Sequence, residues 1–320
     1  MKFAVVIATR NRHAALSKLL TDIKNSETRP DQRIIVSSGD PLSRETLEIV
    51  GATRVSHLHL VEGGQIAQKK SGIELVQDDI DWVIFLDDDV RISSKLLSQF
   101  KNEVKNLESR YINSIGGVGF RIPETSRITQ RNYVHKLVAR IFLLDSPRRG
   151  KVLLSGHPTS YMESNLRMRT EWLTGISAWK KDLLSEYGSK FQHTSYAAME
   201  DVFFSYKVSS SSILEYIPEL RVDFQIEYIT NLNTARIYSL TSIWTYFLVR
   251  ESPKLSMTLF LYSQIGRSAH FIFSRKVRLN FHEKCSLVSF VNYSILTNLA
   301  RKQDFGSLLE KIETSKWLAA

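Results

Sequence analysis

The chain has 320 residues, of which 43 are Lys or Arg and 33 are Asp or Glu, so its formal net charge at pH 7 is +10. Hydrophobic residues make up 43% of the sequence, which is enough for a sizeable core and excludes a disordered or collagen-like chain. Cys285 is the only cysteine, so the sequence excludes an internal disulfide and favours a reducing compartment. The sequence contains no run of 18 uncharged apolar residues, so no segment is predicted to span a membrane.

Short apolar strands alternate with amphipathic helices over the first 120 residues. Strands are predicted at 2–8, 33–36, 55–61 and 82–86, and helices at 14–23, 63–76 and 96–107. This rhythm is typical of an α/β domain with a mostly parallel sheet between two layers of helices. Ligands bind at the carboxyl ends of parallel strands, so three segments are expected to lie together: 9–12, 37–40 and 87–89.

The rest of the chain is less regular. Residues 121–156 are rich in Arg, Pro and Ser and are predicted to form a mobile connection. Helices are predicted at 180–187 and 199–208, and strands at 213–217 and 222–226. From residue 236 onward, apolar segments interrupted by cations predict a helical region. Ten basic and two acidic residues between Arg236 and Lys302 give that part a net charge of +8.

Three consecutive aspartates, Asp87, Asp88 and Asp89, follow the apolar strand at 82–86. Adjacent carboxylates repel one another, and Mg²⁺ or Mn²⁺ would offset this cost while bridging them to a diphosphate. In an extended segment Asp87 and Asp89 point to one side and Asp88 to the other. The alternative is a polar turn that caps the helix beginning near Ser93. The position after a buried strand favours the metal site.

Glu200 and Asp201 are a second acidic pair, at the start of an apolar helix. A carboxylate near the sheet edge can act as a general base. The alternative is that both acids only stabilise the helix, because negative charge is favourable in the first turn.

Two further segments give weaker signals. Gly63 and Gly64 open a helix whose N-terminus can receive a phosphate or a sugar hydroxyl, although the segment lacks the P-loop and GxGxxG spacings. Gly175 lies between Trp172 and Trp179, an arrangement that suits contact with a sugar ring. Buried structural tryptophans are at least as common.

Taken in order, these segments resemble the family 2 glycosyltransferases, which have the GT-A fold. Residues 5–12 look like the family's first strand and nucleotide-contacting turn, and residues 34–40 are similar to its second strand. Residues 64–72 resemble its G-x-x-x-Q-R-N-x-G helix start, with Gln68 and Lys69 at the Gln and Arg positions. Residues 87–89 look like its DxD metal motif, and 200–201 like its ED pair, whose aspartate is the usual base. The resemblance spans about residues 3–210.

The chain departs from the family pattern at specific positions. Ser37 and Ser38 stand where the family often has an aspartate that contacts the base of a uridine nucleotide, which leaves the nucleotide base open. Lys70 replaces the common Asn of the helix start. Residues 246–251 look like a YY-x-x-RN element of bacterial surface-polysaccharide members, with Glu251 at the Asn position.

The resemblance implies an inverting, metal-dependent glycosyltransferase. It would move a sugar from a nucleotide-diphosphate sugar to a glycan or lipid-linked acceptor, in bacterial surface polysaccharide synthesis. The implied catalytic residues are Asp201, as the base, and Glu200. The implied nucleotide and donor contacts are Thr9, Arg10, Arg12, Ser38, Gln68, Lys69, Asp87 and Asp88. Asp89, with Asp87, would hold Mn²⁺ or Mg²⁺, and the implied acceptor residues are Trp172, Gly175 and Trp179.

The resemblance also implies a GT-A catalytic domain at 1–235, with a nucleotide-sugar half at about 1–115 and an acceptor half at about 116–235. The basic, apolar helical region at 236–320 either packs on this domain or docks through 236–302 on an anionic membrane. We expect a cytoplasmic protein, peripheral on the inner face of the cell membrane in the second case. No nucleic-acid partner is expected. The alternatives are a non-catalytic, glycosyltransferase-like membrane-associated binding protein and a sugar nucleotidyltransferase.

Overall fold

The computed structural model describes residues 1–44, 46, 48, 55–61, 63–112, 114–122, 133–162, 164–187, 198–225, 234–274, 277–301 and 304–315. Contacts divide the chain into two compact units. Unit 1 comprises Met1–Arg127 and Tyr161–Ile229, and unit 2 comprises Ile128–Ser160 and Thr230–Ala320. All the residues predicted to form the catalytic and donor sites therefore belong to unit 1.

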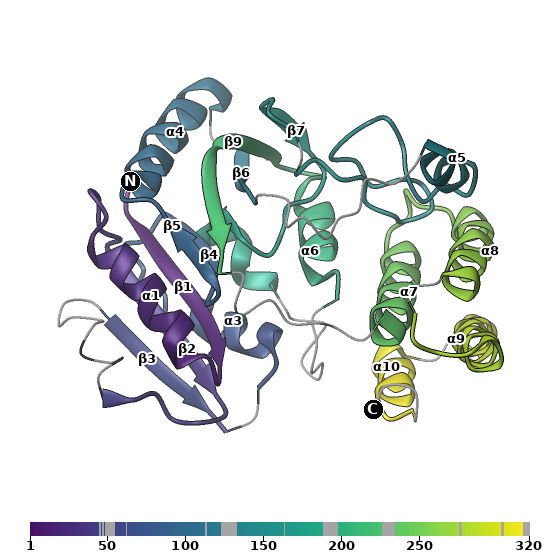
Figure 1. The fold of residues 1–320 in the computed structure, drawn as a ribbon. Coiled ribbons are helices and arrows are strands. Elements are labelled where there is room, and N and C mark those ends of the chain that lie inside the picture. Colours follow the sequence, from purple (N-terminus) through teal and green to yellow (C-terminus); the bar gives the residue numbers. More distant parts are fainter. Residues whose placement is uncertain are drawn as a thin grey trace. The chain divides into compact units, whose positions relative to one another are not determined.

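Unit 1 is built on one mixed sheet (Figure 1). In the described residues its strands are β1 (Phe3–Arg10), β2 (Gln32–Ser38), β3 (Val55–Leu60), β4 (Trp82–Asp87), β5 (Val90–Ile92), β6 (Ile115–Arg121), β7 (Met168–Thr170), β8 (Ser177–Lys180) and β9 (Ile213–Phe224). The strand order is β3-β2-β1-β4-β8-β6-β9-β5, and β7 pairs with β9. The block β3-β2-β1-β4 is parallel throughout, as is the pair β6 and β9. The pairs that involve β5, β7 and β8 are antiparallel.

Helices cover both faces of this sheet. They are α1 (His13–Lys24), α3 (Gln65–Glu74), α4 (Leu96–Tyr111), the 3₁₀ helix η1 (Lys181–Glu186) and α6 (Glu200–Val208). Alternation along β1 directs Phe3, Val5 and Ile7 into a core shared with α1 and α4. Ala4 and Val6 enter the opposite core, which is shared with η1 and α6. The predicted α/β class, with helices flanking the sheet and further helices at the C-terminus, is confirmed.

Several elements differ from the sequence-based expectation. No strand was predicted at β5, β6, β7 or β8, and β9 runs unbroken from Ile213 to Phe224, where two strands were predicted at 213–217 and 222–226. The helix predicted at 180–187 is present as the 3₁₀ helix η1, which begins at Lys181 because Lys180 belongs to β8. Strand β6 lies in a glycine-rich segment of low strand propensity. Tertiary packing requires glycine in this strand, because a Cβ at Gly117 would lie 2.8 Å from the Trp179 ring on β8. Packing therefore overrides the low strand propensity.

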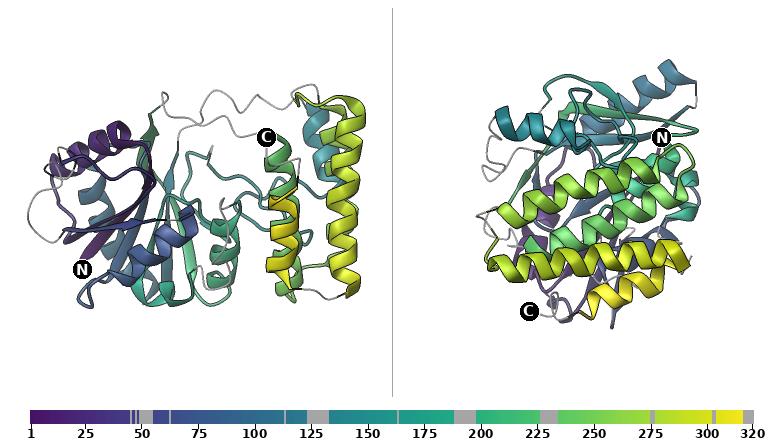
Figure 2. Two further views of the ribbon diagram at one scale, coloured as in Figure 1. Left: turned by 90° about the horizontal axis from the view of Figure 1, so that it is seen from below. Right: turned by 90° about the vertical axis from the view of Figure 1, so that its right-hand side faces the viewer.

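Unit 2 is helical in its described residues. It contains α5 (Tyr133–Ile141), α7 (Thr234–Glu251), α8 (Met257–Phe273), α9 (Phe281–Arg301) and α10 (Phe305–Glu313). Helix α5 lies in the segment expected to be a mobile connection, part of which (123–132) is outside the described residues. Helix α7 packs against α8, α9 and α10, and Figure 2 shows the four side by side.

Aromatic residues fill the interior of unit 2. Phe305 stacks on Phe247 with ring centroids 4.0 Å apart and meets Trp244 edge-on at 5.2 Å. The buried Asn298 Oδ1 accepts hydrogen bonds from Tyr246 Oη at 2.9 Å and from Arg250 Nη1 at 3.0 Å. Among the helices that the structure describes, none is both long and apolar enough to cross a membrane.

Some of the basic side chains of the C-terminal region form hydrogen bonds within unit 2. Arg250 contacts Asn298, and Lys284 Nζ donates to the carbonyl of Ser274 at 2.7 Å. Arg275, Lys276 and Lys302 lie outside the described residues. Docking of residues 236–302 on a membrane therefore stays a prediction.

Candidate active site

The carboxyl ends of β1, β2 and β4 bring the first candidate residues together. Thr9 pairs with Ser37 and Arg10 with Ser38 across β1 and β2, while Ala8 pairs with Asp87 on β4. The segments 9–12, 37–40 and 87–89 therefore lie at one edge of the sheet, as the parallel pattern predicted.

Asp88 is the buried member of the aspartate triplet. Its Oδ2 accepts a hydrogen bond from Thr9 Oγ1 at 2.6 Å, and its Oδ1 accepts from Arg12 Nη1 at 3.1 Å. The same Arg12 Nη1 donates to Asp89 Oδ2 at 2.9 Å. Burial raises the pKa of Asp88, and the contacts with Thr9 and Arg12 oppose this rise. Thr9 and Arg12 thus fix the turn that carries the acids, while Arg10 is exposed.

Asp87 and Asp89 have a chemistry that fits a divalent cation. Asp87 Oδ1 accepts from Gln65 Nε2 at 3.2 Å, so the first turn of α3 orients it. Burial and the charge of Asp87 together raise the pKa of Asp89 to about 6, against the effect of Arg12. A bound cation would relieve this repulsion. In the described chain, no group of three or more His, Cys, Asp or Glu could hold a metal ion by itself.

Gln225, just after β9, holds the backbone of the triplet. Its N–H donates to the Asp89 carbonyl at 2.7 Å, and its Nε2 donates to the Val90 carbonyl at 3.1 Å and the Asp88 carbonyl at 3.5 Å. It is 137 positions from Asp88 in the sequence. No local sequence pattern indicates that Gln225 contacts a segment so far away, so the sequence analysis did not identify this residue.

The turns after β1 and β2 are locked together. Asn11 has a φ of +55°, and its Oδ1 accepts from the Asp40 N–H at 2.7 Å. Gly39 has a φ of +80°, and a Cβ there would lie 2.1 Å from Asn11 Oδ1. Gly39 is thus required both for its backbone conformation and for the close approach of Asn11.

Gly39→Ala is expected to lower the free energy of unfolding by about 1–3 kcal/mol, because alanine is strained at this φ and its Cβ displaces Asn11. Urea unfolding measures the change. Gly63→Ala is the control, since Gly63 has no left-handed φ and its nearest neighbour would be a Leu60 methyl group at 3.2 Å. Equal stability of the two variants would contradict the role given to Gly39.

Two histidines of β3, which sequence reasoning passed over, contact the end of β2. Ser37 Oγ is hydrogen-bonded to His57 Nε2 at 2.8 Å and to His59 Nδ1 at 3.0 Å, both on β3. Burial and, secondarily, His59 lower the pKa of His57. The adjacent Ser38 Oγ is buried without a hydrogen-bond partner in the described structure. An unsatisfied hydroxyl at this edge is available to a ligand.

Gln68 on α3 is buried and its amide is used within the protein. Its Nε2 donates to the carbonyls of Thr9 at 2.7 Å and Val36 at 2.9 Å. It therefore ties the ends of β1 and β2 together. Its predicted contact with the donor stays a prediction.

Lys69 is a buried cation that faces the second acidic pair. It is only 2% exposed, and its Nζ lies 3.5 Å from Glu200 Oε1 and 3.4 Å from the Gly175 carbonyl. Burial lowers the pKa of Lys69, but the pKa is raised overall by its neighbours, namely Tyr187, Glu200, Asp87 and Asp201. The pKa of Lys69 thus responds both to an acid of the DxD segment and to the acids at the start of α6.

Glu200 and Asp201 occupy the first turn of α6. Burial raises the pKa of Glu200, and Lys69 opposes the rise. Burial likewise raises the pKa of Asp201, against the hydrogen bond that its Oδ1 accepts from the Val202 N–H at 2.8 Å.

The predicted acceptor residues lie in different surroundings. Trp179 is 2% exposed and packs edge-on against Phe204, with centroids 4.7 Å apart. Trp172 is 7% exposed and packs on Tyr161. Gly175, in contrast, lies beside Lys69, with a Cβ position 3.2 Å from Nζ. The two rings serve the core, and a direct acceptor contact for any of the three stays a prediction.

The model of the family described as glycosyl transferase family 2 matches residues 4–164, which is half of the chain. The chain belongs to glycosyl transferase family 2. No curated protein sequence matches it.

Solved structures show the same fold at low identity. TarS from S. aureus gives a TM-score of 0.54 at 13% identity, covering 88% of this chain and 46% of TarS, so the chain spans less than half of that protein. TarS 1-349 in complex with UDP-GlcNAc gives 0.52 at 13% identity, covering 98% and 92%. The mannosyltransferase PcManGT from Pyrobaculum calidifontis, in complex with GDP-Man and Mn²⁺, gives 0.50 at 12%, covering 99% and 83%. The predicted GT-A fold is thereby confirmed.

Proposed function

We propose that this protein is an inverting, metal-dependent glycosyltransferase that uses a nucleotide-diphosphate sugar. The observation that carries the proposal is the arrangement around Lys69. This one buried cation lies 3.5 Å from Glu200, and Asp87 and Asp201 both act on its charge. Lys69 thus interacts electrostatically with a donor-side acid and with an acid suited to proton transfer, which supports the proposal that both act beside one sugar carbon in a direct displacement.

Asp89, with Asp87, would hold Mn²⁺ or Mg²⁺. When bound, the cation would neutralise charge on the diphosphate as it leaves. Arg12 and Gln225 hold this segment in place through Asp89 Oδ2 and the Asp89 carbonyl. Support from a related fold comes from PcManGT, whose structure contains GDP-Man and Mn²⁺.

Asp201 would act as the general base. The acceptor hydroxyl oxygen forms a bond to the anomeric carbon, and the bond from that carbon to the diphosphate oxygen breaks on the opposite face. The electron pair leaves with the nucleoside diphosphate, and the hydroxyl proton passes to Asp201. The raised pKa of this carboxyl improves it as a proton acceptor. Glu200, which forms an ion pair with Lys69, would orient the acceptor molecule.

The nucleotide would lie over the ends of β1 and β2. Thr9 is committed to Asp88, so Arg10 and the unpartnered Ser38 hydroxyl are the groups available to a ligand there. TarS 1-349 was solved with UDP-GlcNAc and PcManGT with GDP-Man, so a uridine and a guanosine donor are both candidates. The acceptor we propose is a glycan or lipid-linked sugar of bacterial surface polysaccharide synthesis, reached in the cytoplasm or at the membrane's inner face.

The test is thermal stability with UDP-GlcNAc, UDP-glucose and GDP-mannose, each with and without Mn²⁺. A donor present at ~100 times its Kd stabilises the folded protein by about 2.7 kcal/mol. We expect one donor to raise the melting temperature only with Mn²⁺, and Asp89→Ala to remove this rise. The exposed Asp182→Ala is the control, since it removes an acid of unit 1 outside the site. No rise with any donor would favour a non-catalytic binding protein.

A further inference from the structure

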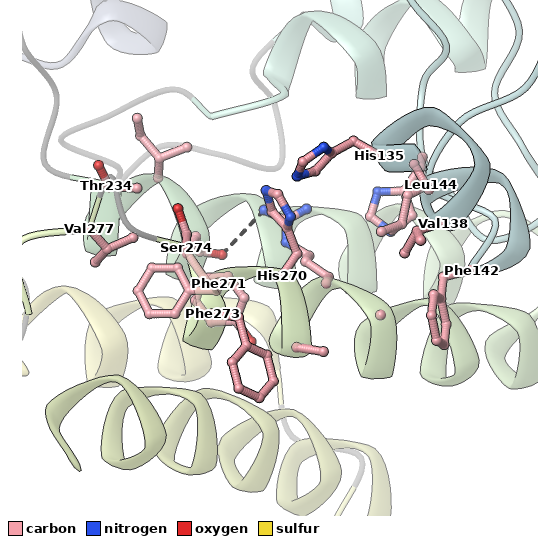
Figure 3. A pocket seen from close by; sticks show the side chains of 17 residues that line it. His135, Val138, Phe142, Leu144, Thr234, His270, Phe271, Phe273, Ser274 and Val277 are labelled. Atoms are coloured by element: carbon pink, nitrogen blue, oxygen red, sulfur yellow. Dashed lines mark hydrogen bonds between the residues drawn. The ribbon is translucent and has the colours of Figure 1, made fainter. Parts of the chain in front are cut away.

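Unit 2 contains a cavity that the proposed reaction does not use. Its volume is about 720 Å³, and it lies between α5, the start of α7 and the C-terminal half of α8 (Figure 3). Most of its wall is apolar and comes from all three helices, with Val138, Phe142, Ile237 and Phe271 as examples. A cavity of this size holds a molecule as large as a typical cofactor or a medium-chain lipid.

Arg267 on α8 brings a positive charge into this apolar wall. Its Nε is buried without a hydrogen-bond partner. Its Nη2 donates to Thr241 Oγ1 and, at 3.5 Å, to the Tyr238 carbonyl, and the guanidinium lies 5.6 Å from the Tyr238 ring. Within the described chain no carboxylate forms an ion pair with it. A cation placed in apolar surroundings without an acid is unfavourable until an anion joins it.

The other polar residues of the cavity do not supply that anion. None of the lining residues is acidic. His157 is neutral, because burial and then Arg267 lower its pKa to about 3, and its Nε2 is hydrogen-bonded to Ser263 Oγ at 3.1 Å. His135 and His270 are exposed and face each other from α5 and α8, with ring centroids 6.2 Å apart (Figure 3). They add hydrogen-bond donors on the solvent side.

We infer that this cavity binds an amphipathic anion, with its phosphate or carboxylate head at Arg267 and its apolar body against Val138, Phe142 and Phe271. The guanidinium, which has no acidic partner, would attract the anionic head of the ligand, and the apolar wall would contact its apolar body. Neither a free inorganic anion nor an uncharged lipid satisfies both features. Burial also lowers the pKa of Arg267 to about 10, which agrees with a cation that lacks a negative partner. This inference does not depend on the proposed glycosyl transfer.

Calorimetric titration of the full chain with dodecyl phosphate, below its micelle concentration, tests the proposal. Inorganic phosphate and dodecanol provide the head and the body separately. We expect dodecyl phosphate to bind at least ten times more tightly than either. Equal binding of dodecanol would overturn the role of Arg267, and equal binding of inorganic phosphate would overturn the role of the apolar wall.

Two variants and a matched control complete the test. Arg267→Met is expected to weaken dodecyl phosphate binding by about 10–100-fold, the usual value of a charge-assisted contact. Its melting temperature without ligand should stay close to that of the wild type, because loss of the contacts with Thr241 and Tyr238 is offset by removal of a partly buried charge that has no acidic partner. The exposed Arg278→Met in the same unit is the control and should bind normally. Ala269→Phe narrows the cavity without changing its charge and should also weaken binding. Unchanged affinity in Arg267→Met and Ala269→Phe would refute the site.

Discussion

Replacement of Asp201 by Asn is expected to lower turnover by about 10²–10⁴-fold, the range for loss of a positioned general base. The amide has nearly the shape of the carboxylate and can still accept the hydrogen bond from the Val202 N–H. It cannot take the proton of an attacking hydroxyl. The start of α6 should therefore keep its structure while the chemical step slows.

The measurement is release of nucleoside diphosphate from the donor that the thermal-stability panel selects, with water or a sugar as the acceptor. Donor affinity, followed through the melting temperature, should change little in Asp201→Asn. Asp182→Asn is the matched control, since it makes the same chemical change at an exposed acid of unit 1. Turnover close to the wild-type value would remove Asp201 from the mechanism. Loss of donor binding would make it a binding residue instead.

Lys69→Met is expected to lower the free energy of unfolding by about 3–5 kcal/mol, because it leaves the buried Glu200 without its cation. The double variant Lys69→Met/Glu200→Gln should recover much of this loss, since the buried side chain that contacts Lys69 is then neutral. Methionine keeps most of the volume of the lysine stem, although it loses the contact between Nζ and the Phe85 ring, whose centroid is 5.7 Å away. A loss caused by packing alone would persist in the double variant.

The pH dependence of the free energy of unfolding separates two causes of the loss in Lys69→Met, namely the uncompensated charge of Glu200 and the change in packing. In Lys69→Met, burial raises the pKa of Glu200 with no cation to oppose it. Between the unfolded and folded pKa values the folded protein keeps a proton that the unfolded chain releases, so stability falls as pH rises through this range. Urea unfolding at pH 4.5 and pH 8 should therefore show a smaller loss at pH 4.5. An equal loss at both pH values would indicate that the charge of Glu200 does not matter.

Local patterns in the sequence were sufficient to predict the fold class and the family. The short, continuous apolar run of β1 and the helical spacing in α1 identify their elements, because each pattern is set by residues that are neighbours in the sequence. The ordered motifs at 5–12, 34–40, 64–72 and 87–89 then predicted family 2, which the match over residues 4–164 confirms. The parallel strand ends at Thr9, Ser38 and Asp87 also meet as expected.

Only the tertiary structure decided what each of these side chains contacts. Arg12 bridges Asp88 and Asp89, and Gln68 joins two strand ends. These contacts, like that of Lys69 with Glu200, join residues far apart in the chain, and no local period records which partner a side chain will meet. The tryptophans are a similar case. Their position on either side of Gly175 suggested contact with a sugar ring, whereas the burial of Trp179 depends on the glycine-rich strand β6 beside it. The charge of Arg267 is visible in the sequence, whereas its isolation in an apolar cavity follows only from the packing of three helices.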